Sequence, residues 1–307
     1  MAFTNTKTAI LTNTSVSELF KGYVVLMKPR ISALLLFTAY CAAIVAKGGF
    51  PDPVTSLALV IGLGLSSGGA AAINMWYDRD IDAIMERTQH RPLPDGLIPA
   101  RNALAFGIVL QVLSLIVFLT FLNPLSALLS FIGYIYYAVI YTMLLKRRTP
   151  QNIVIGGGAG AFPPLVGWAA VTGSISLTAV LMFLVIFFWT PSHFWSLALY
   201  KNSDYKKAGV PMMPVVRGMH STKIQCVIYA VILGIVTIGC GFTPALGIYY
   251  LIPSIIVSLW FLGVNLKLLK EPDNELKWAK KTFHASLIHL PIIFLAMVAN
   301  VLLENLF

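Results

Sequence analysis

The sequence predicts an all-α integral membrane protein with nine transmembrane helices. Of its 307 residues, 58% are hydrophobic and only 11% are charged, whereas a water-soluble domain carries about 25% charged residues. The apolar residues recur in blocks of about 20, which is the length that an α-helix needs to cross the hydrocarbon core of a bilayer. Backbone amides must be paired inside lipid, and the alternating pattern of a membrane β-barrel is missing, so these blocks predict helices.

The predicted spans lie, in chain order, at residues 29–46, 54–77, 101–121, 125–145, 153–171, 178–200, 223–243, 246–266 and 284–304. Residues 1–22 are polar and lack the apolar core of a signal peptide, so we expect a short cytoplasmic tail there. The second and sixth spans end in similar polar segments. This spacing predicts two four-helix halves plus a ninth helix around a central cavity, in a single domain over residues 1–307.

The positive charges predict the orientation of the spans. With the N-terminus inside, 21 of the 22 lysines and arginines fall on the inner side, and only Lys47 falls outside. This asymmetry predicts a multi-pass protein of the cell membrane with a cytoplasmic N-terminus and a C-terminus outside. The net charge of +10 is then a property of the inner face, where it attracts anionic membrane lipids. It does not indicate nucleic-acid binding, which needs a basic patch on a water-exposed module.

Carboxylates gather on the same inner face, which the orientation rule does not require. Four of them lie close together at the end of the second span: Asp78, Asp80, Asp82 and Glu86. On a helix, Asn74, Asp78 and Asp82 step by four residues and share one stripe about 12 Å long. Asp80 points roughly the other way. Like charges four residues apart destabilise a bare helix, so a cation is expected beside them. Hard oxygen ligands without histidine or cysteine suit Mg²⁺ bound together with substrate phosphates.

Arginines and a second polar loop complete this pattern. Arg87 and Arg91 follow the acids, and guanidinium forks match phosphate oxygens. We therefore expect two polar active-site loops, at about 78–100 and 201–222, of which the second carries Asp204. The alternative is a solvated helix end of mixed charge. Asn74 argues against this alternative, because its amide lies at membrane depth on the same stripe as the acids, and polar groups within a membrane are functional candidates.

The spacing N-x-x-x-D-x-x-x-D at Asn74, Asp78 and Asp82, followed by Arg-Thr-x-x-Arg-Pro-Leu, resembles the UbiA-type intramembrane prenyltransferases. Further stretches resemble the heme O synthase branch of that superfamily; they are Lys28-Pro-Arg-Ile-Ser32 and residues 145–164, 190–198 and 204–214. The resemblance covers nearly the whole chain. It implies a helical bundle of nine spans that transfers a farnesyl group from farnesyl diphosphate to a vinyl group of heme B.

The resemblance also implies a site for Mg²⁺ and diphosphate. Asn74, Asp78 and Asp82 would hold the Mg²⁺–diphosphate and would act in catalysis with Asp204. The cations that would neutralise phosphate oxygens are Arg87, Arg91, Lys146, Arg147 and Lys207. Quinone-type relatives carry a second motif D-x-x-x-D, whereas Ala208 stands four residues after Asp204; this disfavours a second protein-bound Mg²⁺ and favours the heme branch. The implied partners are farnesyl diphosphate, heme B and membrane lipids, with heme A synthase or another oxidase-assembly protein as a further one.

The expected contacts with the heme acceptor depend on individual residues. His193 is expected to ligate or contact the heme, or else to be a hydrogen-bonded histidine in a helix distorted by Pro191. Arg30 is expected to meet a heme propionate or to anchor the first span. Trp189, with other aromatic residues, would contact the heme and stabilise cationic character in an apolar cavity. Small residues at 156–161 favour close helix packing and leave room for a bulky flat ligand.

Two other functions fit parts of the pattern. An intramembrane prenyltransferase with a quinone precursor or another aromatic acceptor shares the acidic stripe, but the missing acid at position 208 and the stretch 190–198 weigh against it. A transporter that couples ions through acids near broken helices would place its ionisable groups near the membrane midplane, and here they gather at one interface. The sequence therefore favours farnesyl transfer to heme B.

Overall fold

The computed structural model describes residues 15–306, and this part of the chain forms helices without strands. Within it, nine helical segments are long and apolar enough to cross a membrane, which confirms a multi-pass membrane protein. The spans are α2 (Pro29–Lys47), α3 (Pro53–Asp82), α4 (Ala100–Phe121), α5 with the π-helix η2 (Pro124–Ile135 and Tyr136–Leu145), α6 with α7 (Asn152–Gly156 and Gly158–Thr172), α8 (Leu177–Tyr200), α11 (Met219–Cys240), α12 (Ile248–Lys270) and α13 (Lys277–Glu304). The shorter helices are α1 (Val16–Leu26), α9 (Asn202–Lys207) and α10 (Met213–Arg217).

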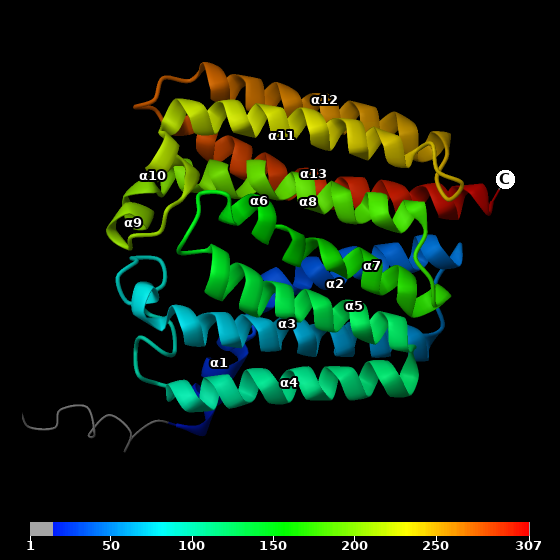
Figure 1. Ribbon diagram of the computed structural model, residues 1–307. Coiled ribbons are helices and arrows are strands. Elements are labelled where there is room, and N and C mark those ends of the chain that lie inside the picture. Colours follow the sequence, from blue (N-terminus) through cyan, green and yellow to red (C-terminus); the bar gives the residue numbers. More distant parts are fainter. Residues whose placement is uncertain (1–14, 307) are drawn as a thin grey trace, which may run out of the picture.

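The spans lie side by side in one bundle, with roughly parallel axes (Figure 1). In the first half, α2 packs on α3, α3 on α4 and α4 on α5. The second half repeats this order, with α7 on α8, α8 on α11 and α11 on α12. α2 also packs on α7, its counterpart in the second half, while α13 packs on α2, α8 and α12. This packing confirms two four-helix halves joined by a ninth helix.

The largest differences from the predicted ranges lie at the end of α3 and at the start of α13, next to the charged loops. α3 continues through Asp82, past the predicted end at 77, because its polar last turns pack inside the protein instead of entering water. α13 begins at Lys277, ahead of the predicted start at 284; the Glu271 carboxylate accepts a bond of 2.7 Å from the backbone N–H of Trp278, which satisfies one of the free donors of the first turn. The fifth span is divided at Gly157 into α6 and α7.

The predicted polar tail ends earlier than expected. Residues 1–14 of the expected tail lie outside the described part, and from Val16 the chain is helical in α1. The helix starts with a reciprocal capping box, in which the Ser15 backbone N–H donates to the Glu18 carboxylate at 2.8 Å and the Glu18 N–H donates to the Ser15 hydroxyl at 3.2 Å. Val16 and Phe20 expose large apolar side chains, as in a helix that lies at a membrane surface.

The middle of the bundle is held by direct contact between helix backbones. A Cβ atom added to Gly167 would overlap the carbonyl group of Ala39, so α2 and α7 touch through their main chains. Between α3 and α4, a Cβ added to Gly69 would lie 2.7 Å from the Gly107 carbonyl oxygen, and one added to Gly107 would lie 2.9 Å from that of Gly69. Small residues at these crossings are what such close packing of membrane helices requires.

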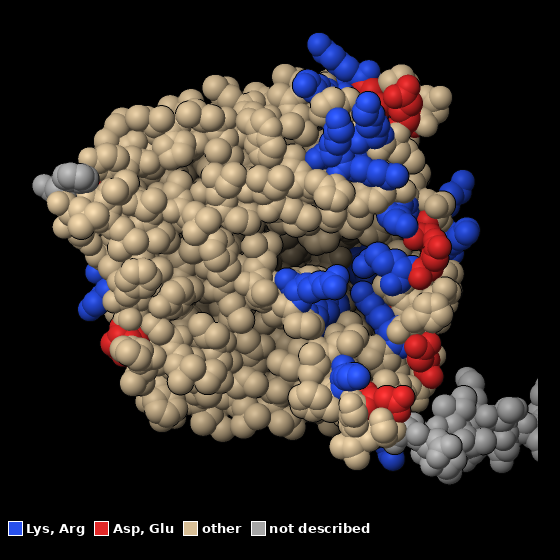
Figure 2. Space-filling model, turned by 180° about the vertical axis from the view of Figure 1, so that it is seen from behind, with Lys and Arg blue, Asp and Glu red and all other residues tan. Residues whose placement is uncertain are grey.

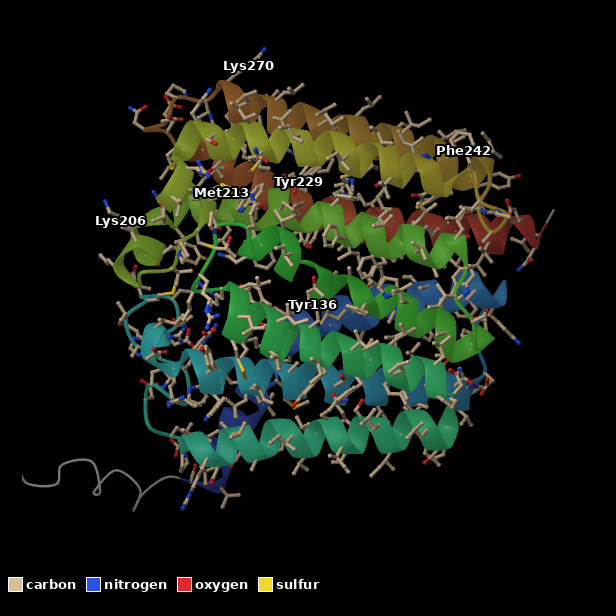
Figure 3. All side chains as sticks on the ribbon, in the orientation of Figure 1. Tyr136, Lys206, Met213, Tyr229, Phe242 and Lys270 are labelled. Carbon is tan, nitrogen blue, oxygen red and sulfur yellow. The ribbon has the colours of Figure 1, made fainter. Side chains whose placement is uncertain are left out.

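Charged side chains gather at one end of the bundle, which we call the basic end. Figure 2 shows lysine and arginine side chains crowded there around a hollow in the surface. Lys206 and Lys270 mark this end in Figure 3, and Phe242 marks the opposite end. The basic end contains the connections from α3 to α4, from η2 to α6, from α8 to α11 and from α12 to α13.

Candidate active site

Three oxygen-bearing side chains form a buried stripe where α3 reaches the basic end. Asn74, Asp78 and Asp82 are 3%, 0% and 2% exposed, so bulk water does not solvate them. Asn74 Nδ2 donates to Asp78 Oδ2 at 2.8 Å, which shows that residues four apart share this face. Asp80 points away, and its side chain is 60% exposed. Because burying a carboxylate is costly unless it is paired, the stripe requires neighbouring cations.

Each buried carboxylate of the stripe has its own cation. Lys146 Nζ lies 2.5 Å from Asp78 Oδ2, and Arg91 Nη1 donates to Asp82 Oδ2 at 2.6 Å. Lys146 follows η2, and Arg91 comes from the loop after α3, so two separate loops supply the pairs. The last turn of α3 is fixed by Thr88, whose hydroxyl donates to the Asp82 carbonyl at 3.0 Å. The bonds from Lys146 and Arg91 to the carboxylates are charge-assisted, and such bonds are about twice as strong as neutral ones.

Arg147 is held beside the stripe by a carboxylate that does not belong to it. Its two Nη atoms each donate at 2.7 Å to the Asp80 carboxylate, the bidentate geometry that arginine favours. Arg147 Nη2 also donates to the Tyr77 carbonyl at 3.1 Å and approaches Asp78 Oδ1 at 3.5 Å. The bond to Asp80 raises the pKa of the Arg147 guanidinium, although burial opposes this. Asp80 therefore positions a cation for the stripe.

Lys28 reaches the stripe from the junction between α1 and α2. Its Nζ donates to Asn74 Oδ1 at 2.6 Å and to the Tyr137 hydroxyl at 3.2 Å. Its backbone φ is 50°, the one positive φ of a non-glycine residue in the described range 15–306, and such a conformation costs free energy. Burial lowers the pKa of the Lys28 ammonium, and the charge of Arg91 lowers it further. The strained backbone and the half-buried charge mark Lys28 as a site residue that the sequence interpretation did not single out.

The π-helix η2 forms the wall that faces the stripe. The backbone N–H of Lys146 donates to the Tyr141 carbonyl, five residues earlier, at 2.9 Å, so the turn contains one residue more than an α-helical turn. Thr142 Oγ1 accepts a bond of 3.0 Å from Asn74 Nδ2. The rings of Tyr137 and Tyr141 stack with their centroids 5.6 Å apart. π-helices are rare, and π-helical turns are frequent at functional sites; η2 extends over ten residues and ends next to Lys146, so it sets the direction in which Lys146 leaves the helix.

The second polar loop packs against the first. Tyr205 of α9 belongs to the same buried apolar cluster as Ile81 and Met85 at the end of α3. Burial raises the pKa of the Tyr205 hydroxyl, and the adjacent Arg87 guanidinium opposes this through its charge and a hydrogen bond. Asp204 precedes Tyr205 and is 6% exposed. Arg87 and Asp204 therefore lie where the two loops meet, and neither forms an ion pair with the stripe within residues 15–306.

Two of the predicted cations lie outside these contacts. Lys207 is exposed in the last turn of α9, and Arg30 is exposed in the first turn of α2. In the part of the chain that the structure describes, neither side chain forms an ion pair. The geometry gives Lys207 no contact with the stripe, so its expected role at the diphosphate stays a prediction.

His193 and Trp189 belong to a stacked aromatic layer between α8 and α13. The ring centroid of His193 lies 4.2 Å from that of Trp189 and 4.8 Å from that of Phe283. His193 Nδ1 is 2.7 Å from Ser286 Oγ, and Trp189 Nε1 donates to the Ser286 carbonyl at 2.9 Å. Both side chains are buried. These contacts give each residue a structural role, and the expected heme contact stays a prediction.

The donor set of the stripe suits a metal ion that is bound together with phosphate. No group of three or more His, Cys, Asp or Glu side chains within residues 15–306 is placed to hold a metal ion. Two carboxylates and an amide oxygen leave several coordination positions for phosphate oxygens and water, which is the usual way in which proteins bind Mg²⁺. The surrounding lysine and arginine side chains can neutralise the remaining phosphate charge. Mg²⁺ and a diphosphate therefore fit these residues as a pair.

Comparison with known sequences identifies the family to which the chain belongs. Residues 35–287 match the model of the UbiA prenyltransferase family, and the chain belongs to this family of prenyltransferases. A curated relative from Symbiobacterium thermophilum is named protoheme IX farnesyltransferase. It is 49% identical over 284 residues, which cover 92% of this chain and 95% of the relative.

Solved structures share the fold at much lower sequence identity. A structure that describes digeranylgeranylglyceryl phosphate synthase superposes with a TM-score of 0.77 at 23% identity, covering 92% of this chain and 99% of that one. A UbiA homolog from Archaeoglobus fulgidus, solved with GPP and Mg²⁺ bound, superposes with a TM-score of 0.61 at 18% identity, covering 90% of this chain and 99% of its own. These likenesses establish the arrangement of the helices.

Proposed function

We propose that the protein transfers a farnesyl group from farnesyl diphosphate to a vinyl group of heme B, giving heme O and diphosphate. The observation that carries the proposal is the buried stripe of Asn74, Asp78 and Asp82, in which two carboxylates already face lysine and arginine side chains. The stripe supports the prenyl diphosphate half of the reaction. The acceptor is supported by the relative named protoheme IX farnesyltransferase, at 49% identity.

Mg²⁺ is the ion that we propose for the stripe. Asp78, Asp82 and the side-chain oxygen of Asn74 would hold it, and the A. fulgidus homolog was solved with Mg²⁺ and GPP. When bound, Mg²⁺ would act as a Lewis acid on the diphosphate and make it a better leaving group. Lys146 and Arg91, which pair with the carboxylates, would turn to phosphate oxygens.

The side chains around the stripe would assist the breaking of the allylic C1–O bond. The electron pair of that bond leaves with the diphosphate, and Lys28, Lys146 and Arg147 would stabilise the developing negative charge. The heme vinyl group then forms a carbon–carbon bond with farnesyl C1. Water quenches the new cation on the heme side, loses a proton and leaves the hydroxyl group of heme O. The stacked rings of Tyr137 and Tyr141 border the stripe, where aromatic faces favour cationic character and exclude water.

The acceptor would lie against the aromatic layer between α8 and α13. His193 and Trp189 would contact the porphyrin from this layer, with the His193 ring held by its stacking and by Ser286. Arg30 lies in the first turn of α2, which packs on α13, so we propose it as the partner of a heme propionate. A partnership with heme A synthase or another oxidase-assembly protein stays a prediction.

The distribution of charge supports one orientation in the cell membrane. We propose that the N-terminus is cytoplasmic and the C-terminus outside, because 21 of the 22 lysines and arginines then lie on the cytoplasmic side. The stripe would then open toward the cytoplasm, where a charged diphosphate is soluble in water.

The reaction is tested in membranes of a host that lacks its own heme farnesylation. Heme extracted from cells that express the chain should contain heme O, identified by chromatography and mass, and Asp78→Asn should abolish it. Asp95→Asn is the matched control, since Asp95 lies in the loop after α3 with its side chain 50% exposed and outside the stripe. Heme O should persist in this control.

Two outcomes would contradict parts of the proposal. If the folded wild-type chain makes no heme O when farnesyl diphosphate is supplied, heme B is not the acceptor, and aromatic acceptors are the next substrates to test. If Asp78→Asn makes heme O at the wild-type rate, the stripe does not bind the diphosphate.

A further inference from the structure

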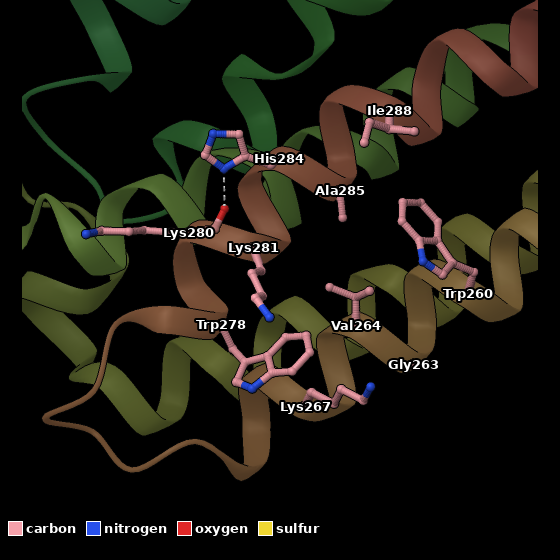
Figure 4. A pocket seen from close by; sticks show the side chains of 10 residues that line it. All are labelled: Trp260, Gly263, Val264, Lys267, Trp278, Lys280, Lys281, His284, Ala285 and Ile288. Carbon is pink, nitrogen blue, oxygen red and sulfur yellow. Dashed lines mark hydrogen bonds between the residues drawn. The ribbon is translucent and has the colours of Figure 1, made fainter.

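A groove lies between α12 and α13 on the outer surface of the basic end, away from the stripe. It encloses about 590 Å³, and Figure 4 shows it from close by, with lysine side chains at one end and apolar side chains along the other. Three of the lining residues, Lys281, Ala285 and Ile288, project from one face of α13. The residues of α13 that contact His193 and Trp189 lie on another face. No residue of the stripe or of its cations lines this groove.

The mouth of the groove concentrates positive charge without acidic partners. The Nζ atoms of Lys267 and Lys281 lie 5.0 Å and 4.5 Å from the ring centroid of Trp278, so both ammonium groups contact the same indole ring. Lys280 adds a further charge. Among residues 15–306, none of these lysines forms an ion pair. Unpaired ammonium groups gathered around one ring favour the binding of an anion.

Glu271 and Glu275 line a neighbouring pocket beside Lys267 and Trp278, and no acidic residue lines the groove itself. Glu271 is buried and accepts the backbone N–H of Trp278 at 2.7 Å. Lys223 Nζ donates to the Glu271 carbonyl at 2.6 Å and pairs with Asp273 at 2.9 Å. These contacts also fix the connection between α12 and α13, so the groove is formed before any ligand arrives.

The floor of the groove is apolar and continues toward the middle of the membrane. Trp260 and Val264 lie on α12 before Lys267, and Ile288 lies on α13 after Lys281. From Lys267 to Trp260 the helix advances about 10 Å, the distance from a lipid headgroup to the upper acyl chain. A Cβ atom added to Gly263 meets no atom within 4 Å, so the space beside this residue is open.

We propose that this groove binds one anionic phospholipid of the surrounding leaflet. The phosphate would lie between the ammonium groups of Lys267 and Lys281, and an acyl chain would lie on Trp260, Val264 and Ile288. Charge complementarity carries the choice of ligand, since basic pockets between membrane helices bind anionic headgroups. The apolar floor below the charges distinguishes a lipid from a free phosphate. The inference is independent of the proposed farnesyl transfer.

The test uses the full chain reconstituted in phosphatidylcholine vesicles that contain a minor fraction of a lipid with brominated acyl chains. Bromine quenches nearby tryptophan fluorescence, and Trp260 and Trp278 line the groove. Brominated phosphatidylglycerol should quench more than the same amount of brominated phosphatidylcholine. Trp260→Phe should remove most of this excess, and inorganic phosphate added to the buffer should not reduce it.

Two variants separate the groove from general surface charge. Lys267→Gln with Lys281→Gln should lower the apparent affinity for the anionic lipid by roughly tenfold. Lys270→Gln with Lys277→Gln removes the same charge from the same two helices outside this groove and should change it by less than about twofold. Gly263→Leu fills the open space with all lysines retained and should also abolish the excess quenching. Gly239→Leu, on α11 and equally free of neighbours within 4 Å, should retain it.

Several results would overturn the proposal. Equal quenching by the two brominated lipids would show that the groove does not select an anionic headgroup. Equal losses in the two lysine double variants would show that the preference comes from diffuse surface charge. Loss of the excess on adding inorganic phosphate would identify the ligand as a free anion. Unchanged quenching in Gly263→Leu would place the lipid elsewhere.

Discussion

The ends of α3 and α8 occupy equivalent places in the two halves of the bundle, yet they carry different side chains. The end of α3 buries Asp78 and Asp82 and gives each of them a cation. The end of α8 leads into α9, where Asp204 is buried while Lys207 is exposed. Ala208 occupies the position at which a second acid would complete the motif.

This difference indicates that the two halves serve different parts of the proposed reaction. The first half concentrates charge where a diphosphate must be neutralised. The second half, together with α13, provides the stacked layer of His193, Trp189 and Phe283. Such an apolar layer suits the side on which a cation must be protected from water. A repeated helical fold therefore does not require a repeated site, because the side chains at equivalent positions are free to differ.

The largest expected effect comes from removing one carboxylate charge from each loop. Asp82→Asn removes the partner of Arg91 and a proposed Mg²⁺ ligand, so farnesyl transfer should fall about 10²–10³-fold. Asp204→Asn removes an acid of similar burial from the second loop and should cost about tenfold. The rate is measured across a Mg²⁺ titration, and the Mg²⁺ concentration for half-maximal rate should rise only in Asp82→Asn. Equal losses and equal Mg²⁺ shifts would show that the two loops share the metal.

A smaller effect is expected from the cations of the two loops. Lys146→Gln removes the ammonium group that pairs with Asp78, so catalytic efficiency with farnesyl diphosphate should fall roughly 10- to 100-fold. Lys207→Gln removes an exposed charge and should change it by less than about twofold. Steady-state kinetics with varied farnesyl diphosphate gives both values. A loss in Lys207→Gln as large as that in Lys146→Gln would mean that α9 closes over the diphosphate in the complex.

The aromatic layer should respond mainly in stability. His193→Ala removes a buried ring from between Trp189 and Phe283 and leaves the hydroxyl of Ser286 with only its bond to the Phe283 carbonyl, so the free energy of unfolding should fall by about 2–3 kcal/mol. His193→Phe keeps a stacked ring and should lose only about 1 kcal/mol. Thermal unfolding in detergent gives the order of the two variants. If His193→Phe is as stable as the wild type but has lost activity, the imidazole contacts the substrate.

The smallest effect is expected from completing the motif of the second loop. Ala208→Asp completes D-x-x-x-D, but α9 ends at Lys207, and within residues 15–306 the first acid of this motif, Asp204, forms no ion pair. Activity should change by less than about twofold, and the number of Mg²⁺ ions bound per chain, measured by equilibrium dialysis, should stay the same. A second bound Mg²⁺ would show that the acid at this position is enough to build a metal site.

The sequence predicted the features that depend on local periodicity. The length of the apolar blocks set the spans, and the spacing of Asn74, Asp78 and Asp82 set the stripe, because residues four apart lie on one face of any α-helix. The structure places Lys146 and Arg91 beside the stripe, and their expected contact with phosphate oxygens stays a prediction. The sequence also placed both polar loops at one end of the bundle, and the structure packs them against each other.

The features that the sequence did not predict depend on contacts between distant residues. Lys28 is separated from Asn74 by 46 residues, and nothing in the local pattern indicates a left-handed backbone before Pro29. The sequence of the π-helix η2 cannot be distinguished from that of an apolar α-helical span, because one extra residue in a turn does not change the composition. Asp80 was expected to point away from the stripe, and it does; its bidentate bond to Arg147 could not be seen without the fold.

The contact between Gly167 and Ala39 bears on how substrates enter and leave. The main chains of the two halves meet there, with no side chain between them whose rotamer could change. A mechanism in which one half rocks against the other would have to separate this contact in every turnover. We therefore expect the helices to stay fixed relative to one another while the loops at the basic end move. Turnover should therefore respond to the stiffness of the loops at the basic end.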